Sequence, residues 1–122
     1  MNAINWFEIP ATDFARAQAF YERIFGVTLK QDASFPDIRM AIFPAAADGV
    51  AGAVIEMPQA KPHADGVRVY LNGGDNLSAV LDRVEAAGGT ITMPKTFLRE
   101  EIGHIAMFAD TEGNLIGLHS LH

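Results

Sequence analysis

The feature that most constrains this chain is an internal repeat. Two stretches with helical hydrophobic spacing each end at a glycine, and the separation of Asp13 from Gly26 equals that of Asp75 from Gly88. One offset of 62 positions therefore superimposes the two stretches, and twice that offset is close to the chain length of 122 residues. Self-similarity at one fixed offset indicates a single structural unit that is used twice.

The segments around each helical stretch repeat in the same order. We predict one helix over residues 12–25, capped by Thr12, and a second from residue 75 or 76 to residue 87. Strand-like runs flank them, at 2–9, 27–30, 38–43 and 51–57 and then at 67–72, 90–93, 102–108 and 114–119. The prediction is an α+β fold of two tandem β-α-β-β-β modules, about 1–58 and about 66–122, in a single domain, because one module alone would leave a sheet face uncovered.

The composition narrows the functional classes. With no cysteine, the chain cannot form a disulfide framework, a zinc finger or a thiol nucleophile, so His, Asp or Glu would have to hold any metal. A net charge of -6 and nine scattered Lys and Arg residues argue against a nucleic-acid partner. The chain shows neither a leader-like start nor eighteen consecutive apolar residues, so we expect a cytoplasmic protein without a membrane partner.

Alternation along the predicted strands selects the candidate site residues. In the strand before the second helix, Val67, Val69 and Leu71 form an apolar set that we expect to pack on the helices. The opposite face of that strand carries Arg68, Tyr70 and Asn72, and the repeat offset places Trp6 and Glu8 on the equivalent face of the first strand. Glu56 and a histidine near the end of the last strand complete the set. The candidate ligand-binding and catalytic residues are Trp6, Glu8, Glu56, Arg68, Tyr70, Asn72 and His119.

Structural explanations of the same residues stay open. Glu8 could be ion-paired with Arg68 or Arg39, since structural ion pairs also occur in clefts. His119 lies three residues from the C-terminus and could be a solvated terminal histidine. Trp6 could serve packing alone.

Several motifs, in order, resemble the vicinal oxygen chelate superfamily, which includes glyoxalases, bleomycin-resistance proteins and extradiol dioxygenases. They are WFEIPATD at 6–13, AFYE at 19–22 and FG at 25–26, then AAGG at 86–89, FADTEGN at 108–114 and IGLHS at 116–120. The resemblance spans nearly the whole chain. It implies a cupped mixed sheet around a ligand cavity and assembly as a homodimer.

The enzymes of that superfamily hold a divalent metal with one His or Glu from each of four strands. The corresponding positions in this chain are Trp6, Glu56, Arg68 and Gly117, with Val69 in place of Arg68 if the alignment has a one-residue gap. Only Glu56 among them is a metal-ligand type. An open catalytic site needs about three protein ligands, so we expect no cofactor at the usual positions. A displaced divalent-metal site made of Glu8, Glu56 and His119 stays open, and it would suit manganese, iron or zinc.

Two functions follow from these residues. The first is a metal-free protein of the bleomycin-resistance kind that binds a small organic molecule, with Trp6 and Tyr70 stacking on a planar group and Arg68 pairing with an anion. The alternative is a metal-dependent lyase or isomerase of the glyoxalase type, with Glu8 or Glu56 as the base. A third, a module that binds another protein through a sheet edge, has no residue that singles it out.

Overall fold

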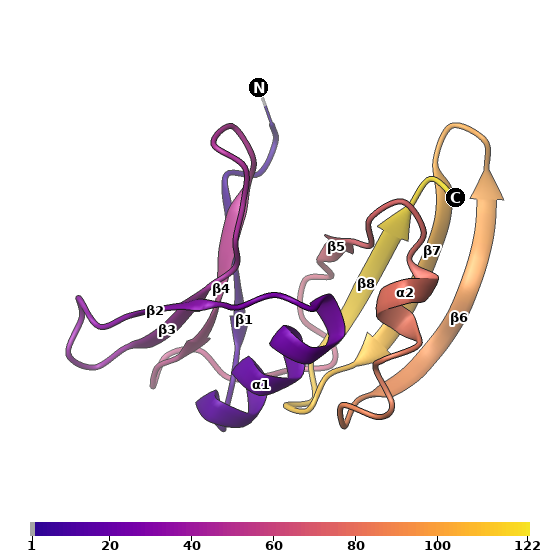
Figure 1. Cartoon of the computed structure of the whole chain (residues 1–122). Helices are drawn as coiled ribbons and strands as arrows, with labels where there is room; N and C mark the ends of the chain where they lie inside the picture. The colour runs from indigo at the N-terminus through magenta and orange to yellow at the C-terminus, as the bar shows by residue number, and fades with distance from the viewer. Residues whose placement is uncertain (1) are drawn as a thin grey trace.

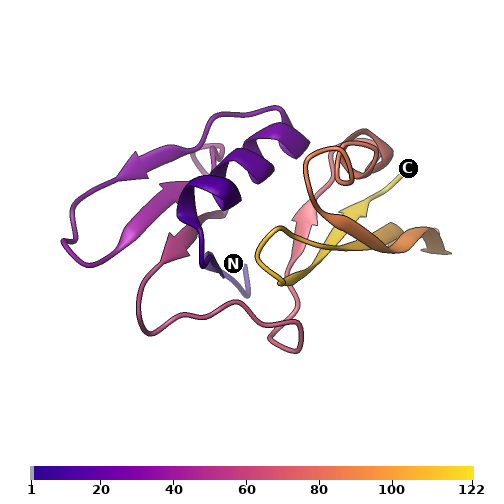
Figure 2. The same cartoon turned by 90° about the horizontal axis from the view of Figure 1, so that it is seen from below.

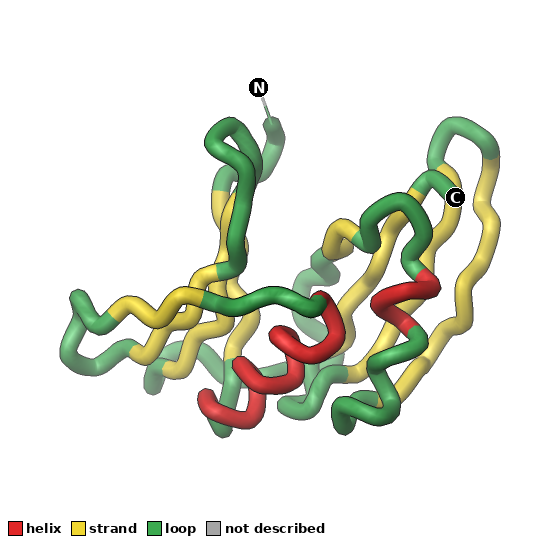
Figure 3. Tube along the Cα trace, viewed as in Figure 1, coloured by secondary structure: helices red, strands yellow, loops and turns green. Residues whose placement is uncertain are grey.

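Two four-stranded mixed sheets with two helices make up the computed structural model, which describes residues 2–122 (Figure 1). The first half contains β1 (Trp6–Pro10), α1 (Phe14–Phe25), β2 (Lys30–Asp32), β3 (Arg39–Ile42) and β4 (Ala51–Glu56). The second half contains β5 (Tyr70–Asn72), α2 (Ser78–Leu81), β6 (Thr90–Arg99), β7 (Gly103–Ala109) and β8 (Leu115–Ser120). The predicted α+β fold with two β-α-β-β-β modules is confirmed, as the distribution of helix and strand in Figure 3 shows.

The two sheets have the same topology. The strand orders are β1-β4-β3-β2 and β5-β8-β7-β6, so each strand of the first sheet has its repeat equivalent at the same place in the second. In each sheet the first strand pairs in parallel with the last, and the other pairs are antiparallel. The strands β1 and β5 are therefore edge strands, and the two sheets are separate rather than one continuous cup.

Local sequence explains where α1 begins and ends. Asp13 is extended, and its side chain accepts a hydrogen bond from the Arg16 amide at 3.1 Å, so the cap is Asp13 rather than the predicted Thr12. Gly26 ends the helix in the left-handed conformation, with φ at 64°. The buried residues of α1 recur at helical spacing: Phe14, Ala17, Phe20, Tyr21 and Ile24.

Helix α1 lies between the sheet of the first half and the second half of the chain (Figure 2), and its buried side chains belong to a core that both halves share. The Phe20 ring lies 5.0 Å from that of Tyr21 and 5.8 Å from that of Phe108 on β7, while Tyr21 also lies 5.7 Å from Phe43 next to β3. A single core therefore joins both sheets through α1. We call the face of each sheet that is turned away from this core its outer face.

Two elements differ most from their predicted lengths, and β5 begins only at Tyr70, which leaves Val67 exposed instead of packed on the helices as expected. The regular part of α2 is only Ser78–Leu81, because its cap residue Leu77 has no side-chain hydrogen bond and the turns that follow mix different hydrogen-bond spacings. Strand β6 runs on to Arg99, past Pro94, since an edge strand with register shifts tolerates a residue without an N–H. Across residues 2–122, no helix is long and apolar enough to cross a membrane.

Candidate functional site

The predicted site residues fall into separate groups on the two sheets. Trp6 and Glu8 lie on β1, while Tyr70, Asn72 and His119 lie on the neighbouring strands β5 and β8. Both groups are on outer faces, since the residues between them in sequence are those that pack on the core. Within one chain, the fold thus supplies two candidate half-sites.

The first half-site is an aromatic and acidic pair on β1. Phe7 packs against the core and Ile9 belongs to it, so Trp6 and Glu8 point the other way. The Trp6 indole Nε1 donates a hydrogen bond to Glu8 Oε2 at 3.3 Å, and Trp6 stays 40% exposed. Both residues line a recess of about 360 Å³ together with the exposed Lys61.

The second half-site centres on Tyr70. Its strand register pairs Tyr70 with Gly117, and a side chain at Gly117 would begin only 2.4 Å from the Tyr70 ring. The ring therefore lies flat on the β8 backbone, which requires glycine at that position. Tyr70 is 45% exposed and is thus available for stacking.

Polar side chains adjoin the Tyr70 ring. The ring nitrogen Nε2 of His119 hydrogen bonds to the Ile102 carbonyl at 2.5 Å, which orients the imidazole and shows that it is more than a solvated terminal residue. Asn72 Oδ1 accepts a hydrogen bond from the Gly74 amide at 2.8 Å. Tyr70, Asn72 and His119 line a recess of about 530 Å³. Arg68 is exposed and lies before β5, outside the strand.

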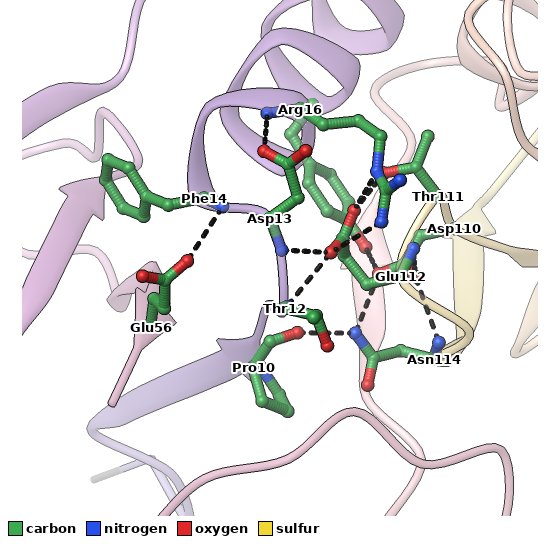
Figure 4. A network of polar contacts seen from close by, with 11 residues as sticks. Pro10, Thr12, Asp13, Phe14, Arg16, Glu56, Asp110, Thr111, Glu112 and Asn114 are labelled. Carbon is green, nitrogen blue, oxygen red and sulfur yellow. Dashed lines mark hydrogen bonds and ion pairs between the residues drawn. The ribbon is translucent and has the colours of Figure 1, made fainter. Parts of the chain in front are cut away.

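Glu56 lies on the other face of its sheet. The parallel register pairs Glu8 with Ala53 and Ile9 with Val54, so Glu56, two residues after Val54, faces the helix side. Its Oε1 accepts a hydrogen bond from the Phe14 amide at 3.0 Å in the first turn of α1 (Figure 4). The expected grouping of Glu56 with Glu8 on one face is therefore not found.

The residues present do not fit the four-ligand metal centre of the superfamily. The carboxylate of Glu56 is engaged by the Phe14 amide and lies 4.0 Å from the Arg39 guanidinium. From residue 2 to residue 122, no three His, Asp or Glu side chains gather in a way that could hold a metal ion. The side chains of the expected displaced site do not converge either. Glu8 and Glu56 lie on opposite faces of the first sheet, and His119 lies on the second sheet.

Sequence reasoning missed a polar network where the second half meets the first. Glu112 accepts hydrogen bonds from the amides of Thr12 at 2.9 Å and Asp13 at 2.7 Å, and its other oxygen accepts one from Arg16 Nε at 2.7 Å (Figure 4). The Glu112 side chain is completely shielded from solvent. In the sequence this segment lies between two predicted strands and within a family motif, but nothing local to it identifies a partner about one hundred residues away.

Asp110 is the buried part of the same network. Its carboxylate accepts hydrogen bonds from the Tyr21 hydroxyl at 2.7 Å and from both the backbone and side-chain nitrogens of Asn114 at 2.9 Å. Burial, reinforced by the charge of Asp110 and this hydrogen bond, raises the pKa of Tyr21 well above its ordinary value. The Tyr21 phenol therefore stays protonated and joins the helix of the first half to the second half.

The Glu112 network predicts acid sensitivity. Burial alone would raise the pKa of Glu112, but hydrogen bonds from Arg16, Asp13, Thr111 and Thr12 outweigh it and lower the pKa below the ordinary 4.5. The ionised carboxylate therefore stabilises the fold above pH 4.5, and this contribution is lost as the pH falls through the lower pKa of the folded state.

Urea unfolding at a series of pH values checks this expectation. The difference in free energy of unfolding between the wild type and Glu112→Gln should be largest near neutrality and narrow toward acid pH. Glu101→Gln is the matched control, because Glu101 forms only an exposed pair with Arg99. A wild-type advantage over Glu112→Gln that stays constant with pH would contradict the prediction.

The fold and these half-sites define a protein of the glyoxalase type, with two modules whose outer faces carry aromatic and polar residues. The chain belongs to the Glyoxalase/Bleomycin resistance protein/Dioxygenase superfamily, which it matches over residues 3–118. The resemblance to the vicinal oxygen chelate group is thereby confirmed. A glyoxylase-like domain-containing protein of Didymella fabae is 34% identical over 118 residues, covering 91% of this chain and 88% of that protein.

Solved structures share the fold over almost the full length. TnmS3, an antibiotic binding protein from Streptomyces, has a TM-score of 0.72 at 24% identity, covering 98% of this chain and 96% of that chain. A glyoxalase/bleomycin resistance protein from Albidiferax ferrireducens also has a TM-score of 0.72, at 15% identity, covering 96% and 97% of the two chains. At these identities the likeness concerns the fold alone.

Proposed function

We propose that this protein binds a small planar organic molecule on the outer faces of its sheets and does so without the usual four-ligand metal site. One observation carries the proposal. The first sheet exposes the Trp6 ring and the second exposes the Tyr70 ring, and each ring lies beside polar side chains in a recess of a few hundred Å³. Recesses of that size with aromatic walls and few polar groups are typical of small-molecule sites.

A complete site requires a second copy of the chain. The outer faces of the two sheets point away from the shared core, so Trp6 and Tyr70 of one chain do not face each other. Among residues 2–122, β1 pairs only with β4 and β5 only with β8, which leaves one side of each edge strand free. Free edges are ready to pair with another chain. A homodimer that sets β1 of one copy beside β5 of the other would bring the two half-sites into one cleft.

Relatives support this kind of ligand. The superfamily includes bleomycin-resistance proteins, and TnmS3 is an antibiotic binding protein. Two aromatic rings suit an extended planar ring system by stacking, while Glu8, Asn72 and His119 offer hydrogen-bond partners around it.

Fluorescence offers a direct test, because Trp6 is the single tryptophan of the chain. Titration with bleomycin and with a set of polycyclic quinones, in the presence of a chelator, should give saturable quenching by at least one compound. Tyr70→Ala should weaken that binding by roughly tenfold or more, since one stacking partner is lost, a change of about 1.4 kcal/mol or more. Phe97→Ala removes an exposed ring elsewhere and is the matched control. No quenching with any compound, or binding that requires added Mn²⁺ or Zn²⁺, would contradict the proposal.

Mixing two defective variants tests whether the site is shared between copies. By isothermal titration calorimetry, which does not need the Trp6 indole, Trp6→Ala and Tyr70→Ala should each bind poorly alone, since each damages every composite site of its homodimer. A heterodimer of the two carries one site with both substitutions and one intact site. Unfolding and refolding the variants together should therefore restore binding to about a quarter of the wild-type sites. If the mixture binds no better than its components, the site does not span two copies.

A further inference from the structure

We infer a second binding site, inside a single chain, for a small uncharged apolar molecule. A crevice of about 410 Å³ lies between the two halves. Phe7 and Phe43 line it from the first half and Leu71 lines it from the second. These side chains belong to the helix-facing sides of their sheets, and of the outer-face site residues only Tyr70 and Asn72 also border the crevice. The inference goes beyond the proposed function and does not depend on it.

One wall of the crevice is a fixed aromatic cluster. The Phe43 ring lies 5.6 Å from that of Phe7 and 6.2 Å from that of Phe25 at the end of α1. A side chain at Gly52 would begin 2.3 Å from the Phe7 ring, so glycine there lets Phe7 lie directly on the β4 backbone. The three rings are partly buried because one side of each packs on the core. The part that stays uncovered lines the crevice. Such a wall is already formed before a ligand arrives.

The chemistry of the lining selects an uncharged ligand. None of the residues that line the crevice is Asp, Glu, Lys, Arg or His. A charged group placed there would lose its hydration without gaining an ionic partner, which is costly. This contrasts with the outer faces, where Glu8 and His119 lie.

Two residues of β5 supply the polar groups of the lining. Tyr70 and Asn72 line both this crevice and the recess of the second half-site, so the two sites adjoin along β5. The rest of the lining is apolar, and a neutral aromatic compound matches it.

The test uses N-phenyl-1-naphthylamine, an uncharged probe whose fluorescence rises in apolar surroundings. The wild-type protein should give a saturable increase. Val50→Phe and Val27→Phe each fill the crevice from a different segment, and each should weaken probe binding by roughly tenfold, which corresponds to about 1.4 kcal/mol. Val67→Phe is the matched control, because it makes the same change at a residue that is 95% exposed and does not line the crevice.

Further readouts separate this site from the outer faces and from misfolding. Circular dichroism and the thermal midpoint of each variant show whether it is folded, and filling an apolar crevice should leave the midpoint equal or higher. Trp6→Ala and His119→Ala alter the outer faces at residues that do not line the crevice, so they should leave probe affinity unchanged. Failure of the proposed outer-face site would therefore not affect this result.

Four outcomes would overturn the inference. The first is the absence of saturable probe binding to the wild type, and the second is wild-type affinity in folded Val50→Phe and Val27→Phe. The third is a loss of affinity in Val67→Phe as large as in those two variants. The fourth is a change in sedimentation of the crevice-filling variants without a change in probe affinity. The last result would assign the crevice to contact between two copies of the chain.

Discussion

Replacing Asp110 with alanine is expected to lower the free energy of unfolding by about 3 to 4 kcal/mol. Four donors converge on this carboxylate, which is only 6% exposed: the Tyr21 hydroxyl, the Glu112 amide, and the amide and side-chain nitrogens of Asn114. Each buried donor that loses its acceptor lowers the free energy of unfolding by roughly 1 to 3 kcal/mol, and by less where a water molecule replaces the acceptor. Urea unfolding followed by circular dichroism measures the loss.

Tyr21→Phe is the control for Asp110→Ala, since it removes one donor and leaves the carboxylate with its other three. The expected loss is about 1 to 2 kcal/mol, clearly smaller than that of the alanine variant. If Asp110→Ala cost less than Tyr21→Phe, the network would not be what joins the two halves.

Phe108→Ala should cost about 3 to 5 kcal/mol, the range for removing a fully buried phenylalanine ring. Phe108 is 0% exposed, and its ring lies 5.8 Å from that of Phe20 and 6.4 Å from that of Tyr21, so the cavity would open between α1 and the second sheet. Phe97→Ala makes the same chemical change at a side chain that is 57% exposed, and it should stay within about 0.5 kcal/mol of the wild type. Equal losses in the two variants would contradict the assigned core.

The order of elements was predictable because the repeat imposes it. Once Asp13 to Gly26 matched Asp75 to Gly88, one set of strand patterns constrained the other. The lengths of the helices and strands were less predictable. The predicted strand ended at residue 93, just before Pro94, whereas β6 continues past it because its position at the sheet edge makes the missing N–H harmless. Edge position is a tertiary property that periodicity does not contain.

The candidate site was predictable within each strand but not between strands. Alternation placed Trp6 with Glu8 correctly on the outer face. Alternation also put Glu56 on the same side as Val54. Both faces of that strand are nearly all apolar, so only the register with β1, which pairs Val54 with Ile9, shows that this side faces the core. That register depends on which strands pair, a tertiary property that alternation along one strand does not contain. The same dependence explains why the sequence suggested one shared cup, whereas one chain carries two separate outer faces.

The reach of Glu112 back to the start of α1 has a consequence for biosynthesis. The amides of Thr12 and Asp13 depend on a carboxylate that is encoded 100 and 99 positions later, respectively. While the ribosome is still adding the second half, the first turn of α1 lacks this partner and the aromatic face of the helix lacks Phe108. The N-terminal half is therefore expected to stay open to proteases and chaperones until Phe108 and Glu112 have emerged from the ribosome, so its final closure is expected to wait for the second half.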